Sequence, residues 1–188
     1  MIPRKYIKDY RIDEDFGING RVKSKAVYIG ADYTLSPPVP FGVRRLVLCL
    51  SALAGLTYIG ALIPEMRAAR LIYVMLPFAF SALPVYFMIA SSISLLRFKE
   101  TASRVEADRI ANRLPPSALI AAILAGGSFI GFVVSAAAGV SAGVRGGMSQ
   151  DAGSLAGDYI FSVLAPLLTF LSATVFVKTK RIKAEAVI

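Results

Sequence analysis

Two stretches of the sequence carry residue types that could do chemistry, and the first is Gly126-Gly127-Ser128. A nucleophilic serine can be exposed on a strained turn in which it stands between two glycines, with the spacing GxSxG. Here Ile130 stands where the closing glycine belongs, and the chain has no histidine to act as the base. We therefore predict that Ser128 is a packing residue.

The second stretch is Asp13, Asp15 and Asn19, whose oxygens could begin a calcium-binding loop. Such a loop needs a glycine at its sixth position and a glutamate at its end. Ile18 holds the glycine position and no glutamate closes the loop. Because Asn19-Gly20 is a strong turn dipeptide, we predict a hairpin turn here rather than a metal site.

The composition excludes several kinds of chemistry. Without histidine, the chain has no ligand for histidine-bound haem, no Ser-His or Cys-His pair and few means of binding zinc. It also has no P-loop and no dinucleotide fingerprint. Cys49 is the only cysteine, so we expect a small packing residue there. We predict no catalytic residue, no cofactor, no metal and no enzyme activity.

Four long apolar stretches are the elements that must position any functional side chains. They run over residues 46–63, 71–96, 117–140 and 159–177, and none contains Asp, Glu, Lys or Arg. The shortest has 18 residues, which as a helix covers roughly 27 Å, about the hydrocarbon thickness of a bilayer. Apolar residues make up 56% of the chain, and the mean hydropathy is +0.64. We predict an all-α membrane protein with four transmembrane helices.

The positive charge follows the loops between these spans. The net charge of +9 divides into +4 in residues 1–45, +2 in residues 97–113 and +3 in the tail 178–188, whereas the other two loops sum to zero. This is the positive-inside pattern, which predicts that both termini and the loop 97–116 are cytoplasmic. We therefore expect no nucleic-acid partner. The basic residues expected at the membrane interface are Arg44, Arg45, Lys178, Lys180 and Arg181.

The segment before the first span is predicted to form a small cytoplasmic β-hairpin. Its strands are expected over Tyr6–Ile12 and Val22–Tyr33, with the turn at Asn19-Gly20. A two-stranded ribbon is only marginally stable alone, so we expect it to lean on residues 97–113 or on a partner. A proline-rich connector then leads to residue 45.

Prolines predict where the helices change direction. Pro77 and Pro84 lie in the second span and Pro166 in the fourth, and each removes a helix hydrogen bond and can kink its helix. We expect the second helix to continue through Arg97 to Arg113. Pro115-Pro116 is expected to end it.

The first and third spans are similar to each other, which suggests that the chain contains two parallel-repeated helical hairpins. The alternative is chance, because membrane spans use Gly, Ala, Leu and Ile heavily. Between residues 51–63 and 122–134, five of thirteen positions are identical: Leu53 and Leu124, Ala54 and Ala125, Gly55 and Gly126, Ile59 and Ile130, Gly60 and Gly131.

Small residues in these two spans predict close helix packing. The pairs Ser51 with Gly55 and Gly127 with Gly131 have the small-xxx-small spacing, and Gly60 and Gly126 extend the two surfaces. We expect the first and third spans to pack together at the centre of the bundle. The bulky side chains expected to face outward are Phe78, Phe80, Phe87 and Phe170.

Two functions remain open. The first is a non-enzymatic integral membrane subunit, whose partners are membrane lipid and other membrane protein subunits or a second copy of itself. The alternative is a small oligomeric transporter or channel, favoured by the repeat, the prolines and the span hydroxyls. No acid or base lies within a span, which argues against an ion-coupled pump. The size of the chain favours a bacterial inner (plasma) membrane.

Overall fold

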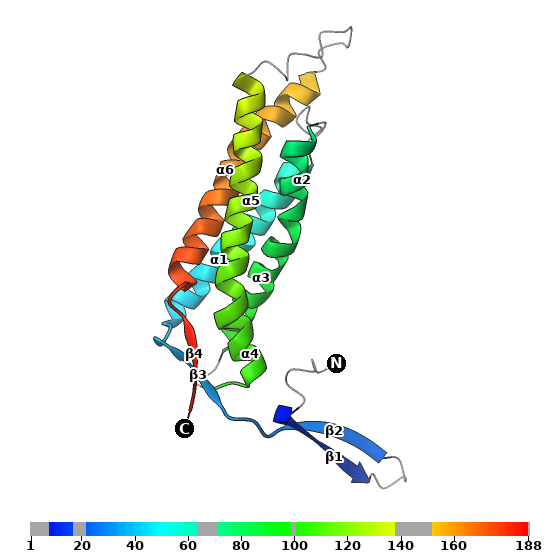
Figure 1. Cartoon of the computed structure of the whole chain (residues 1–188), viewed down its shortest axis with the longest axis vertical. Helices are drawn as coiled ribbons and strands as arrows, with labels where there is room; N and C mark the ends of the chain where they lie inside the picture. Colours follow the sequence, from blue (N-terminus) through cyan, green and yellow to red (C-terminus); the bar gives the residue numbers. More distant parts are fainter. Residues whose placement is uncertain (1–7, 17–21, 64–70, 99–100, 138–151, 188) are drawn as a thin grey trace.

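The computed structural model of the chain describes residues 8–16, 22–63, 71–98, 101–137 and 152–187. Most of them belong to an elongated bundle in which the chain runs alternately up and down (Figure 1). The helical elements are α1 (Phe41–Leu62), α2 (Ile72–Phe80), α3 (Ala82–Arg97), α4 (Arg104–Asp108), the π-helical turn η3 (Arg109–Arg113), α5 (Leu114–Ala137) and α6 (Ala152–Thr179). The base is the end of the bundle near which the strands lie.

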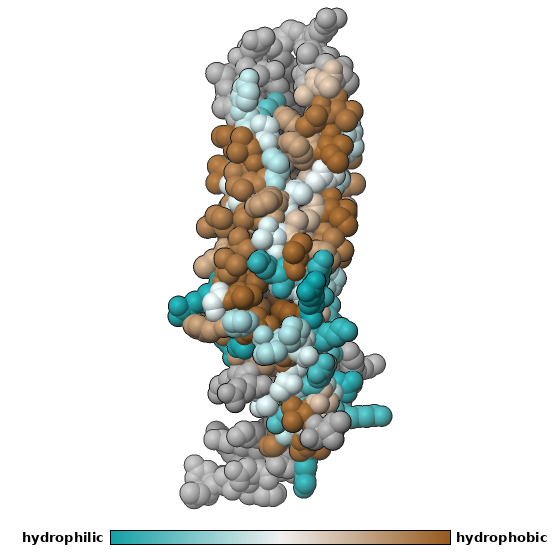
Figure 2. Space-filling model, turned by 90° about the vertical axis from the view of Figure 1, so that its left-hand side faces the viewer, coloured by the Kyte–Doolittle hydropathy of each residue, from teal (hydrophilic) through white to brown (hydrophobic). Residues whose placement is uncertain are grey.

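The helices confirm the four apolar spans that the sequence predicts. The spans Phe41–Leu62, Ile72–Arg97, Arg104–Ala137 and Gly157–Thr179 are each long and apolar enough to cross a membrane. Figure 2 shows apolar side chains covering much of the bundle on the face it displays, with hydrophilic side chains gathered toward the base. The connector 64–70, the segment 138–151 and the predicted Asn19-Gly20 turn lie outside the described residues.

The order of packing corrects the predicted pairing of the first and third spans. α1 packs against α3 and α6, whereas α5 packs against α6, α2 and α3. α1 and α5 are therefore diagonal in the bundle rather than a packed pair. In an up-and-down bundle, antiparallel helices that follow each other in sequence become neighbours, and the first and third helices are left on opposite corners.

The second span is interrupted at Ser81, between α2 and α3. Pro84 lies in the first turn of α3, where a missing N–H costs little, and it cannot donate to the carbonyl of Phe80. Ser81 satisfies the end of α2, because its amide bonds to the Pro77 and Phe78 carbonyls and its hydroxyl donates to Phe78 O at 2.6 Å. α6, in contrast, runs continuously past Pro166.

The helix boundary near the base is not where the sequence predicts it. α3 ends at Arg97 because Phe98 takes an extended conformation, and a new helix begins at Arg104. This new helix continues through Pro115-Pro116 into α5. The two prolines cannot donate to the preceding turn and their rings crowd its carbonyls, which the chain accommodates as the wider π turn η3.

The predicted hairpin is present with shifted bounds. β1 (Tyr10–Phe16) pairs antiparallel with β2 (Val22–Tyr28), in a backbone register that runs from Tyr10 opposite Tyr28 to Phe16 opposite Val22. As expected, the root of the hairpin leans on the 97–113 region. The Tyr28 hydroxyl accepts a bond from the Arg104 amide at 3.1 Å, and the Arg104 guanidinium lies 3.8 Å from the Asp9 carboxylate.

A second small sheet at the base was not predicted. β3 (Tyr33–Ser36) pairs antiparallel with β4 (Lys183–Ala186), which lies in the segment that the sequence presents only as a basic tail. On its other side Tyr33 exchanges backbone hydrogen bonds with Ala102, at 3.0 and 3.1 Å. We call these residues (33–36, 102 and 183–186) the base clasp. It ties together three segments that are far apart in sequence.

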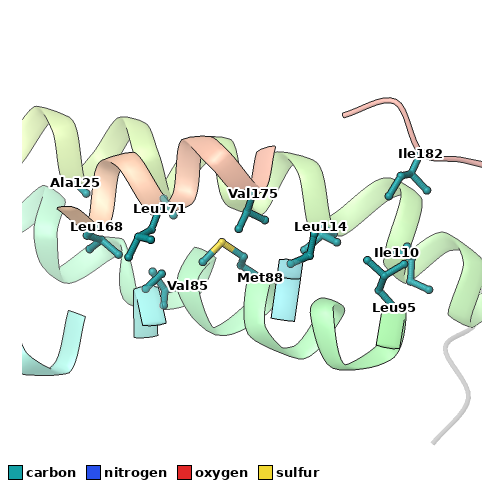
Figure 3. Packing of buried hydrophobic residues seen from close by; sticks show 14 of the residues in the cluster. Val85, Met88, Leu95, Ile110, Leu114, Ala125, Leu168, Leu171, Val175 and Ile182 are labelled. Carbon is teal, nitrogen blue, oxygen red and sulfur yellow. The ribbon is translucent and has the colours of Figure 1, made fainter. Parts of the chain in front are cut away.

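The core runs along the bundle and on into the base. Figure 3 shows side chains of α3, α5 and α6 directed toward one another, with Met88 among Leu171, Val175 and Leu114. All four are at most 4% exposed. Near the base the core continues through Ile110, Leu35, Val39, Phe98 and Ile182, which joins the clasp to the helices.

Candidate functional site

The small residues predicted for packing lie at helix contacts, but with other partners than expected. The Ser51 and Ser92 hydroxyls are hydrogen-bonded at 2.7 Å, which joins α1 to α3. On the same side of α1, a Cβ on Gly55 would lie 2.7 Å from Ile89 Cδ1 of α3. A Cβ on Gly60 would instead meet Leu164 of α6, at 3.5 Å. Small residues thus let α1 approach α3 and α6, not α5.

The glycines of α5 face matching directions. A Cβ on Gly126 would lie 3.5 Å from Thr169 Cγ2 of α6, and one on Gly131 would lie 3.5 Å from Tyr73 and Val74 of α2. Gly55 and its aligned partner Gly126 therefore both face the second span of their own hairpin. Gly60 and its partner Gly131 both face the second span of the other hairpin. The two aligned stretches have the same rotational setting in the bundle.

Gly127 differs from the others, because no atom outside its own helix lies within 4 Å of a Cβ placed there. The pair Gly127 and Gly131 therefore gives a matched test on one helix. Gly131→Leu is expected to destabilise the protein by about 1–3 kcal/mol, because the side chain must displace Tyr73 and Val74. Gly127→Leu should be neutral or stabilising, since leucine favours a helix over glycine.

Unfolding of both variants in detergent, followed by circular dichroism, would check this prediction. Equal losses in the two variants would show that the α2–α5 contact does not depend on the small residue.

Aromatic side chains fill the bundle nearer the end away from the base. Phe78 stacks on Tyr58 with ring centroids 4.9 Å apart, and its edge meets Phe161 at 5.2 Å. Phe161 in turn meets Phe132 at 5.6 Å. The prediction that Phe78 faces outward is wrong, because it is fully buried, whereas Phe80, Phe87 and Phe170 are exposed as expected.

The hydroxyls within the spans bond mainly to their own helices. Ser128 donates to Leu124 O at 2.9 Å, Thr57 to Leu53 O at 2.8 Å and Thr169 to Ala165 O at 2.9 Å. Such bonds to the preceding turn satisfy a hydroxyl without any ligand. Ser128 is fully buried, so its surroundings agree with a packing role.

The basic residues predicted at the interface are distributed over the base and have unequal surroundings. Arg44 is half-buried; its Nε donates to Val39 O at 2.9 Å and its Nη1 donates to Phe98 O. Arg45 is exposed, with its guanidinium carbon 4.4 Å from the centroid of the Phe41 ring. Lys178, Lys180 and Arg181 are also exposed. Arg44 thus connects the start of α1 to the end of α3.

The structure contains a groove that the sequence did not predict. It lies between α2 and α3 on one side and η3 and α5 on the other. It has a volume of about 600 Å³ and mostly apolar walls, to which Phe80, Leu83, Phe87 and Ile120 contribute. Pro84 and Pro116 face it from opposite sides, and its polar residues are Asn112, Arg113 and Ser117. The sequence predicts the two prolines only as helix breakers, and nothing in it indicates that they share a groove.

Metal ions in proteins are bound by groups of His, Cys, Asp or Glu side chains. In the part of the chain that the structure describes, no group of three or more such side chains could hold a metal ion. No family model, curated protein or solved structure matches the chain.

Proposed function

We propose that this chain is a non-enzymatic integral membrane protein that acts as a subunit or assembly partner of a membrane complex. The support is four helices long and apolar enough to cross a membrane, together with basic segments that favour a cytoplasmic side for both termini and the base. The bacterial inner membrane is the setting we favour. Membrane lipid surrounds the exposed apolar side chains of the bundle, and no nucleic acid is involved.

The observation that carries this proposal is the separation of the hairpin from the bundle. β1 and β2 project away from the base in Figure 1, and they pack chiefly on each other. A two-stranded ribbon has two open edges and little core of its own. An arm of this kind, held at its root by Tyr28 and Arg104, suits the addition of a partner's strand.

The closed centre of the bundle supports a subunit over a conducting protein. The ring cluster around Phe78 and the fully buried Met88 and Leu168 occupy the interior that a single-chain pore would need. The alternative, a small oligomeric transporter or channel, would have to place its passage between copies. We keep it as the second candidate because the two halves resemble each other.

We also propose that the two hairpins arose by duplication, as a parallel repeat. The support is the five identities between the first and third spans, together with the matching directions of the aligned glycines. Chance similarity between apolar spans does not require the same rotational setting in both helices.

The test is to purify the full chain in mild detergent beside a variant in which a short Gly-Ser linker replaces residues 9–29. We expect the full chain to carry a protein partner at fixed stoichiometry, and the variant to lose it while keeping the same unfolding temperature. A partner-free homo-oligomer that passes solutes across liposomes would overturn the subunit proposal and support the transporter.

A further inference from the structure

We infer that the groove between α2/α3 and η3/α5 binds one anionic phospholipid, with an acyl chain along its apolar walls and the phosphate at Arg113. This inference rests on the membrane placement proposed above.

The walls of the groove open on the surface that faces lipid. Phe80 is 59% exposed, Leu83 62% and Ile120 47%, so the groove is accessible from the side of the bundle. Its volume of about 600 Å³ lies within the range of small-molecule sites. An acyl chain can therefore lie against protein along this face without displacing any core side chain.

The polar residues of the groove are Asn112 and Arg113, in the π turn toward the base, and Ser117 of α5. The Ser117 hydroxyl is buried and donates to Leu114 O at 2.9 Å. The Asn112 side-chain amide donates to Asp108 Oδ1 at 3.0 Å. This bond engages one oxygen of the carboxylate and holds the amide in place. Arg113 is exposed, and it forms no hydrogen bond or ion pair with another of the described residues. A guanidinium at a bilayer interface pairs well with a lipid phosphate.

The proline pair adds acceptors at the same end. Pro115 and Pro116 have no N–H, so the carbonyls of Ala111 and Asn112 lack an amide donor at the α-helical spacing. Headgroup hydroxyls could donate to such carbonyls. Phosphatidylglycerol offers both a phosphate and hydroxyls, which makes it a suitable probe.

Other occupants fit this combination less well. An apolar helix, from a partner or from a second copy of the chain, would cover Arg113 and leave its charge without a counter-ion, which is costly. A zwitterionic lipid carries its own cation, which would compete with Arg113 for the phosphate. The anionic lipid satisfies the apolar walls and the charge together.

Native mass spectrometry of the full-length protein with equal amounts of phosphatidylglycerol and phosphatidylcholine would test the inference. We expect one phosphatidylglycerol to be retained in preference. Arg113→Gln should reduce that preference about fivefold, the effect of one basic residue near the surface, whereas Arg109→Gln, which removes an exposed charge outside the groove, should not. Ile120→Trp should lower lipid retention, and Ile123→Trp, outside the groove, should not.

Equal retention of the two lipids, or equal effects of the two arginine changes, would overturn the inference. So would a disulfide-linked dimer formed through Leu83→Cys in a Cys49→Ser background, because it would place a second copy in the groove. Extraction of the protein from vesicles by alkaline carbonate would instead refute the membrane placement itself. A protein that stays embedded without selecting its lipid loses only this inference.

Discussion

Phe78→Ala is expected to destabilise the bundle by about 3 kcal/mol, at the lower end of the cost of an aromatic-to-alanine change in a core. Phe78 is fully buried and contacts rings from two other spans, Tyr58 of α1 and Phe161 of α6. If the spans remain in lipid after unfolding, the free energy lost is mainly that of packing between helices. The cavity left behind adds to the loss because the helices can collapse on it only in part.

Phe80→Ala is the matched control, since it removes the same side chain two residues away. Phe80 is 59% exposed, so its loss should cost less than about 1 kcal/mol. Unfolding of the purified protein by sodium dodecyl sulfate in mixed micelles measures both variants. A small effect at Phe78, or equal effects at the two positions, would contradict a packed aromatic centre.

Arg44→Gln is expected to cost about 2 kcal/mol and to loosen the base. The guanidinium donates to Val39 O and Phe98 O, and hydrogen bonds from a charged group contribute about 1.5–3 kcal/mol each when well shielded. The two bonds together are assigned about 2 kcal/mol, less than two fully shielded bonds, because Arg44 is only half-buried and solvent weakens both. Arg44→Lys should recover little, because a single ammonium lacks the fork that reaches two carbonyls.

Arg45→Gln serves as the control for charge. Arg45 is exposed and contacts only the Phe41 ring among the interactions that the structure describes for it, so its loss should cost about 0.5–1 kcal/mol. Hydrogen exchange gives a second measurement, because loosening the base should speed exchange at the Tyr33 and Ala102 amides. If the two arginine variants exchange and unfold alike, Arg44 acts only as a surface charge.

The helix boundaries show where local sequence is a sufficient guide. Long uncharged stretches predicted the four spans because their length and hydropathy need no knowledge of neighbours. The break after Arg97 and the helix through Pro115-Pro116 were not predicted. Phe98 leaves the helix where Tyr33 and Ala102 pair and Arg44 binds its carbonyl, and Tyr33 and Arg44 are distant from Phe98 in sequence.

The residues of the candidate site could likewise be predicted from the sequence only in part. The small residues were identified from their spacing, but their partners were not, because Gly55 can approach any helix that the topology places beside it. Phe78 and Phe80 look alike in the sequence, and only their rotation about the helix axis separates a core ring from an exposed one. The groove residues of α3 and α5 had no shared signal at all.

The sequence by itself determined that this chain has four apolar helical spans, a polar hairpin before them and basic segments at one end, since each depends on the composition of a continuous stretch. The tertiary structure decided which helices are neighbours, that the tail residues 183–186 complete a strand pair with residues 33–36, and that Arg113 ends an apolar groove. These features depend on contacts between segments far apart in the chain, and the free energy of such contacts is not encoded in any one of the segments.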